Sequence, residues 1–161
     1  MKTKLSLAGL LALHCLLISG CDYEVPLTPA PTHKIDTRLL GDWVAIDKDT
    51  QKEEGMKVRK LDDSTYVVSM IDGDIYRVYH SDFAGVAFVS AQDLNSDDRK
   101  YVYYRWSLSA DGHQLTLQAV STGVIPEGTK PGSVIKKLIE QNLANPKLFR
   151  EEQPFTRKKP R

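Results

Sequence analysis

Between residues 41 and 120 the sequence is a succession of short segments in which apolar and polar residues alternate, separated by Gly, Asp and Asn. Alternation with a period of two is typical of β-strands that have one buried face. The longest segment, 101–108, places Tyr104 and Trp106 on one face and Tyr103 and Arg105 on the other. The connections are too short for the helical crossovers of a parallel sheet, so the pattern predicts an antiparallel meander.

Turn residues set the expected limits of these strands. Asp72-Gly73-Asp74 and Asp111-Gly112 have the composition of tight turns. A helix is expected over about 134–144, with Ser133 as its N-cap, and it would pack on the sheet or plug one end. The expected strands are 43–46, 56–61, 66–71, 75–80, 86–91, 101–108 and 115–120, with a closing strand at 154–157. We therefore predict a mainly β fold, a small barrel or half-barrel with one C-terminal helix.

The entry to the first expected strand carries a short motif, Gly41-Asp42-Trp43. It resembles the Gly-x-Trp motif of lipocalins and their smaller calycin relatives. This resemblance implies a lipocalin-like barrel for small apolar ligands, in which the Trp packs beneath an Arg near the end of the chain. Arg157 is the candidate for that Arg, with Arg105 second, and the stack would be a cation–π contact. Trp43 is otherwise interpreted as a core aromatic residue at a barrel mouth.

The residues that we expect at the mouth of the barrel, as candidate ligand contacts, are Trp43, Tyr104, Trp106 and Arg157.

The first 21 residues have a composition unlike the rest of the chain. Lys2 and Lys4 precede an apolar stretch over 5–18, and the small residues Ser19 and Gly20 precede Cys21. The stretch would span roughly 21 Å as a helix, against about 30 Å for a bilayer core, which argues against a permanent membrane span. The segment resembles the signal peptide and lipobox of bacterial lipoproteins.

That resemblance implies cleavage between Gly20 and Cys21 and lipidation of Cys21, on its sulfur and on its new amino group. Two or more acyl chains, palmitate among them, anchor a protein firmly. The protein would then be lipid-anchored to a bacterial membrane and face the periplasm. Asp22 resembles the signal that retains lipoproteins in the inner membrane. Loss of the leader removes Cys15, so we expect no disulfide in the mature chain.

The domain organisation follows from these segments. Residues 1–20 form the leader, 21–37 the lipidated cysteine with a proline-rich tether, 38–157 a single β-rich domain, and 158–161 a basic tail. Pro26, Pro29 and Pro31 favour an extended tether that could reach about 45 Å. The tether would hold the domain away from the membrane surface.

The sequence argues against several classes of function. The formal net charge of +1 indicates no polyanion partner, and we expect no nucleic acid. His33, His80 and His113 lack close His or Cys partners, so we predict no metal site and no cofactor. The chain has no Gly-x-Ser-x-Gly motif, and its Thr129-Lys130 order is wrong for a phosphate-binding loop. We therefore predict a protein that is not an enzyme.

Two functions remain from the sequence. The first is a non-catalytic barrel module that binds a small apolar ligand or lipid near a membrane. The second is an interaction protein that docks on an envelope protein complex and holds no internal ligand. A cavity of at least ~300 Å³ lined by Trp43 and inward tyrosines would favour the first, and a filled interior with an exposed apolar patch the second.

Overall fold

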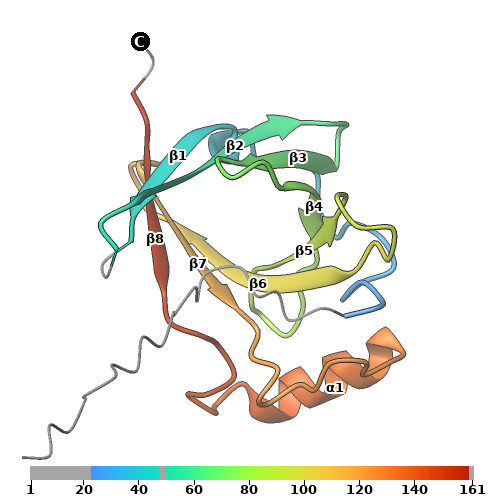
Figure 1. The fold of residues 1–161 in the computed structure, drawn as a ribbon. Coiled ribbons are helices and arrows are strands. Elements are labelled where there is room, and N and C mark those ends of the chain that lie inside the picture. Colours follow the sequence, from blue (N-terminus) through green and yellow to red (C-terminus); the bar gives the residue numbers. More distant parts are fainter. Residues whose placement is uncertain (1–22, 48–49, 160–161) are drawn as a thin grey trace, which may run out of the picture.

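The computed structural model describes residues 23–47 and 50–159, and within them eight antiparallel strands close into a barrel (Figure 1). The elements are η1 (Thr37–Leu39), β1 (Gly41–Ile46), β2 (Glu53–Lys60), β3 (Thr65–Met70), β4 (Ile75–His80), β5 (Phe88–Asp93), β6 (Tyr101–Leu108), β7 (Gln114–Ala119), α1 (Gly132–Asn142) and β8 (Gln153–Arg157). Each strand pairs with the next, and β8 pairs back onto β1. The predicted barrel with one late helix is confirmed, and it is closed rather than a half-barrel.

Some expected boundaries differ from the observed ones. β5 begins at Phe88 instead of residue 86, because Phe83 and Val86 exchange backbone hydrogen bonds and close a tight turn before the strand. The helix begins at Gly132, and its N-cap is Pro131, which makes no side-chain capping bond, so Ser133 does not cap it. Its predicted apolar side is correct, because Ile135 and Ile139 are fully buried.

The barrel interior holds one hydrophobic cluster. Its buried members include Trp43, Met56, Val58, Tyr66 and Phe155. They come from strands that are neighbours around the wall, and the register puts Met56 opposite Trp43 and Val58 opposite Val68. Side chains that pair directly across two strands share a face, so this cluster defines the inward side of each strand.

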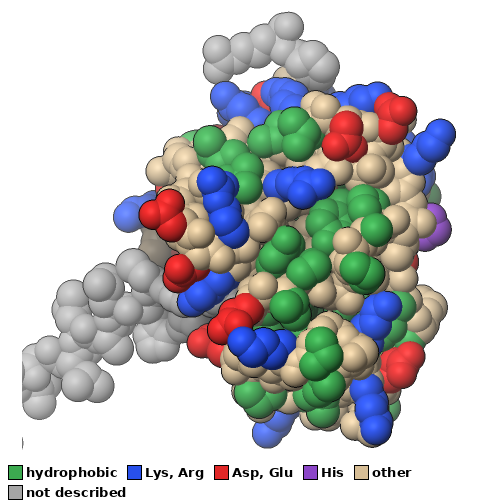
Figure 2. All heavy atoms as spheres, turned by 90° about the vertical axis from the view of Figure 1, so that its right-hand side faces the viewer, with side chains coloured by type: hydrophobic (Ala, Val, Ile, Leu, Met, Phe, Trp, Pro, Cys, Tyr) green, Lys and Arg blue, Asp and Glu red, His purple; other side chains and the backbone are tan. Residues whose placement is uncertain are grey.

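A second hydrophobic cluster lies outside the barrel, between its wall and α1. Phe88 and Tyr103 point outward from β5 and β6 and are fully buried beneath Ile135 and Ile139 of the helix. Figure 1 shows α1 alongside the barrel, and Figure 2 shows apolar side chains reaching the surface over the lower wall and helix. Of the two expected positions for the helix, packing on the sheet is the observed one.

The N-terminal segment 23–36 is also part of this outer layer, which corrects the predicted free tether. Tyr23 and Leu27 are 0% and 1% exposed, and the Leu27 N–H donates to Ser90 Oγ at 3.2 Å. A Cβ on Gly132 would lie 3.0 Å from the Pro26 carbonyl oxygen, so a larger residue there would have to push α1 and the segment slightly apart. The segment bends repeatedly along its course and is packed on the barrel wall, so it is neither extended nor free.

The described residues include no helix with the length and hydrophobicity needed to cross a membrane. Gly20, Cys21 and Asp22, which carry the predicted cleavage site, anchor and retention signal, lie outside the described residues.

Candidate functional site

The two ends of the barrel are built differently. We call the end at which β1 begins and β8 finishes the closed end, and the opposite end the open end. The segment with η1 lies at the closed end, where Leu39 is 6% exposed and joins the interior cluster. At the open end the strand connections are the loops 47–52, 71–74 and 94–100 and the long connection that contains α1.

Arg157 and Trp43 fasten the closed end. The guanidinium carbon of Arg157 lies 4.3 Å from the centroid of the Trp43 ring, so the stack implied by the Gly-x-Trp resemblance is present. Arg157 Nη1 donates to the Leu40 carbonyl oxygen at 2.7 Å, and its Nε donates to the Gly112 carbonyl oxygen at 2.9 Å. One side chain thereby joins β8 to the η1 segment and to the β6–β7 turn.

Gly41 has a physical role in this contact. A Cβ at Gly41 would lie 2.6 Å from Arg157 Nη1, and the backbone there has a φ of +147°. Both observations require glycine. Trp43 is 1% exposed, and its Nε1 donates to the Leu39 carbonyl oxygen at 2.9 Å. Trp43 and Arg157 therefore hold the closed end together, and the expectation that they line a mouth was wrong.

Next to this closure lies a buried polar pair. The Asp36 N–H donates to Tyr66 Oη at 2.5 Å, and Tyr66 Oη lies 2.8 Å from Nε2 of His80. The hydroxyl has one proton to donate, and donation to Nε2 places the proton of the neutral imidazole on Nδ1. Burial raises the pKa of Tyr66 to about 12 and lowers the pKa of His80, which is 3% exposed.

Two buried nitrogen atoms in this region lack partners among the described residues. They are Nδ1 of His80 and Nε1 of Trp106, and the centroids of the two rings lie 5.4 Å apart. Both side chains belong to the inward face of the barrel by their register. A buried donor without an acceptor is costly, so the pair is a place where an acceptor atom would be stabilised.

Several inward side chains are only partly buried. This group contains Met70, Tyr76, Tyr104, Trp106 and Leu117. Their cross-strand pairings place them on the same face as the buried cluster, for example Met70 opposite Met56 and Leu117 opposite Trp106. Met70, Tyr76 and Tyr104 lie toward the open end, where Ala45, Ala91 and Val102 are buried, and we call this half of the interior the cup. We call these five residues the cup wall.

The rim of the cup is acidic. Glu54 pairs with Ala45 and therefore faces inward, and burial, Asp47 and Asp72 together raise the pKa of its carboxyl. Tyr76 Oη donates to Asp74 Oδ2 at 3.4 Å, and burial raises the pKa of Tyr76. The residues of the rim hold no metal cluster, since no group of three His, Cys, Asp or Glu side chains within 23–47 and 50–159 could bind an ion.

Comparisons with known proteins were made for the whole chain. No protein-family model, curated protein or solved structure matches it. The chemistry of the site therefore follows from its own side chains, which are an apolar and aromatic wall, an acidic rim and two donors deep in the cup.

Two hollows occur on the described surface. One, of about 270 Å³, is lined by Arg105, Gln118 and Glu152 together with Trp106 of the cup wall, and another, of about 360 Å³, is formed by the loop around Phe83 and Val86. Arg105 lies 4.0 Å from the Phe149 centroid and donates through Nε to Gln118 Oε1 at 3.0 Å, so it does not stack on Trp43. Neither hollow is the cavity of Trp43 and inward tyrosines that a ligand-binding barrel was expected to have.

The sequence identified part of this site. Tyr104 and Trp106, expected at a mouth, both face the interior of the barrel, Tyr104 midway along β6 and Trp106 nearer its closed-end finish. Glu54 and Met70 were not singled out, His80 was considered only as a metal ligand and rejected, and Tyr76 and Leu117 were not assigned to a site. Residues that pair across an antiparallel sheet share a face. Following the face of Tyr104 and Trp106 from strand to strand across each expected hairpin would therefore have identified these inward residues.

Proposed function

We propose that this protein is a bacterial envelope lipoprotein, anchored through Cys21, whose barrel holds a small apolar molecule or lipid in its open half. The observation that carries the binding function is the partial exposure of the inward cup wall, because an accessible apolar interior is the common form of a small-molecule site. The leader and lipobox support the anchor. Nothing in this function requires catalysis.

The two unpartnered donors suggest which end of a ligand enters first. The cup wall offers Met70 and Leu117 to an apolar chain, and His80 Nδ1 with Trp106 Nε1 offers hydrogen bonds to an acceptor oxygen. A carbonyl, ester or carboxyl group at the deep end of the cup would relieve the cost of leaving these donors unpaired. We therefore expect an amphiphile that carries such a group, with its apolar part toward the open end.

The test is native mass spectrometry of the protein purified from its own membrane, with a variant that fills the cup. Ala119 faces inward opposite Tyr104, whereas Thr116 faces outward opposite Ser107. We expect wild type and Thr116→Trp to carry a non-covalent amphiphile, and Ala119→Trp to lose at least nine-tenths of it. A lipid-free wild type with a stoichiometric protein would contradict ligand binding and favour the docking function. Equal loading of all three proteins would show that the cup is not the site.

A further inference from the structure

The chain is attached to the barrel from the first described residue. The Tyr23 N–H donates to the Tyr101 carbonyl oxygen at 2.8 Å, and the Tyr101 N–H donates back to Tyr23 at 2.7 Å. Tyr23 Oη donates to the Ile125 carbonyl oxygen at 2.8 Å, and the Tyr23 ring stacks on Tyr103 with centroids 4.4 Å apart. With 0% of its surface exposed, Tyr23 is held as firmly as a core residue.

This attachment is at the open end, because Tyr101 is the first residue of β6 and β6 runs from the open end to the closed end. Cys21 precedes Tyr23 by two residues, and two residues span at most about 7 Å. An acyl anchor on Cys21 therefore starts close to the open end of the barrel. The predicted reach of about 45 Å for a free tether is not available to the domain.

The open end also carries exposed large hydrophobic side chains. Ile46 at the end of β1 and Ile71 in the β3–β4 turn are 55% and 65% exposed, and Ile75 at the start of β4 is 39% exposed. The closed end offers Leu61, which is 55% exposed. Isoleucines beside a lipid attachment point are suited to insertion at a bilayer interface, where their apolar surface leaves water.

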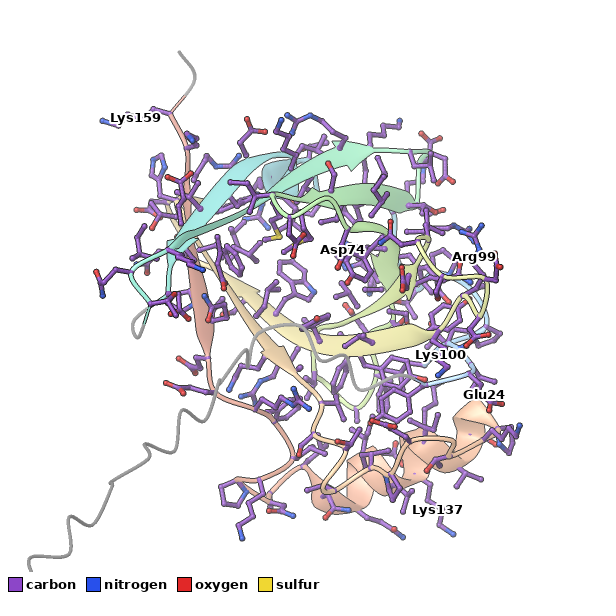
Figure 3. The ribbon with its side chains drawn as sticks, in the orientation of Figure 1. Glu24, Asp74, Arg99, Lys100, Lys137 and Lys159 are labelled. Carbon is purple, nitrogen blue, oxygen red and sulfur yellow. The ribbon has the colours of Figure 1, made fainter. Side chains whose placement is uncertain are left out.

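The charges beside the attachment point are mixed. Figure 3 shows Arg99, Lys100 and Glu24 on the same side of the barrel, with Asp74 on a neighbouring loop. Asn95 of that loop region donates to Asp74 Oδ1 at 3.3 Å, which ties the two loops together. Together with the acidic rim, this mixture fits zwitterionic headgroups, which present both signs of charge, better than a purely anionic surface.

From these observations, and resting on the proposed lipidation of Cys21, we propose that the open rim is the surface that contacts the membrane, so that the mouth of the cup faces the bilayer. The occupant of this surface is a zwitterionic phospholipid interface. Ile46 and Ile71 enter the interface, and an amphiphile passes between bilayer and cup without crossing bulk water. The closed end, with Arg157 and Leu61, points away from the membrane.

The lipidated full chain in phosphatidylcholine vesicles tests this orientation. The mature chain has no cysteine besides Cys21, so a single cysteine introduced by Ile71→Cys or Leu61→Cys takes one fluorescent label. These two sites are matched, because both are exposed isoleucine or leucine positions on opposite ends of the barrel. With a quencher carried on the lipid chains, we expect quenching at position 71 to exceed that at 61 by at least threefold, and position 46 to behave like 71.

The outcomes separate this proposal from the proposed function. Labelled protein that floats with the vesicles but is quenched equally at positions 71 and 61, or more strongly at 61, overturns the orientation while the anchor stands. Protein that does not float contradicts lipidation of Cys21 and removes the orientation with it. Loss of ligand binding in the cup is measured independently by Ala119→Trp.

Discussion

The imidazole of His80 is buried away from water. Its Nε2 lies within hydrogen-bonding distance of the Tyr66 hydroxyl, and its Nδ1 has no partner among the described residues. Burial lowers its pKa and outweighs the opposing effect of Asp82, while His33 acts in the same direction as burial. The folded protein therefore holds the ring neutral at a pH where the unfolded chain already protonates it.

The pH dependence of stability follows from this shift. Between the folded pKa of His80 and the ordinary value of 6.5, the unfolded chain binds more protons, so the free energy of unfolding falls as the pH is lowered through this window. We expect urea denaturation to show this loss in wild type and a smaller one in His80→Gln. His113→Gln, at an exposed turn, is the control and should behave as wild type. Identical pH profiles for wild type and His80→Gln would contradict the assignment.

Arg157 is the second residue with a large expected effect. Arg157→Met removes the stack on Trp43 and the hydrogen bonds to the Leu40 and Gly112 carbonyl oxygens. We expect a loss of about 2–4 kcal/mol in the free energy of unfolding, measured by chemical denaturation. Arg38→Met removes an exposed ion pair with Asp36 and should cost far less than Arg157→Met. Equal losses in the two variants would mean that Arg157 does not fasten the closed end.

At the scale of elements, the segment 23–36 differs most from its prediction. Proline content predicted an extended, solvated tether, but the segment bends over 24–33 and packs on the barrel, and composition does not distinguish a solvated chain from a packed one. The segment packs because Phe88 and Tyr103 present large aromatic side chains on the outside of the barrel. The segment and α1 together bury these side chains. The sequence signal that could have predicted this packing is the presence of the large apolar residues Tyr23 and Leu27 among the prolines.

Truncation of Leu27 tests how much this segment contributes to the free energy of unfolding. Leu27→Ala should lower the free energy of unfolding by about 2–5 kcal/mol, because the side chain is 1% exposed within the outer cluster. Pro29→Ala changes an exposed residue of the same segment and should have little effect. A thermal denaturation series of both variants checks this. If the Leu27→Ala protein were as stable as wild type, the packing of this segment would not contribute to stability, and the predicted free tether would be the better description.

The strands themselves were predictable because each is a local pattern. Alternation and turn residues in 41–120 indicate where strands run. β5 starts two residues late because Phe83 and Val86 bond to each other, whereas β1 and β2 start two and three residues early because they pair with each other beyond the alternating pattern. The apolar side of α1 was correct for the same reason. Its N-cap was not, because Pro131 precedes Gly132 against the N-terminal segment, a contact that local sequence does not encode.

At the scale of the whole molecule, the arrangement joins three features that are far apart in sequence. Tyr23, which follows the lipobox in the sequence, pairs with Tyr101 at the start of β6, the exposed Ile71 is in the β3–β4 turn, and the cup wall includes Tyr76 near the start of β4. These residues lie toward the open end because an antiparallel barrel returns every second connection to the same end. The proposed anchor, membrane-contacting rim and ligand-binding cup are consequences of that one topological property.

The sequence by itself determined the strand succession, the mainly β class and the late helix, since each depends on residues within one segment, and the Gly-x-Trp resemblance implied the stack of Arg157 on Trp43. Only the tertiary structure decided that the barrel closes, which end is open, which face of each strand points inward, and that Tyr23 is buried. These properties depend on which surfaces meet, and the free energy of burying a side chain is set by its partner as much as by its own chemistry.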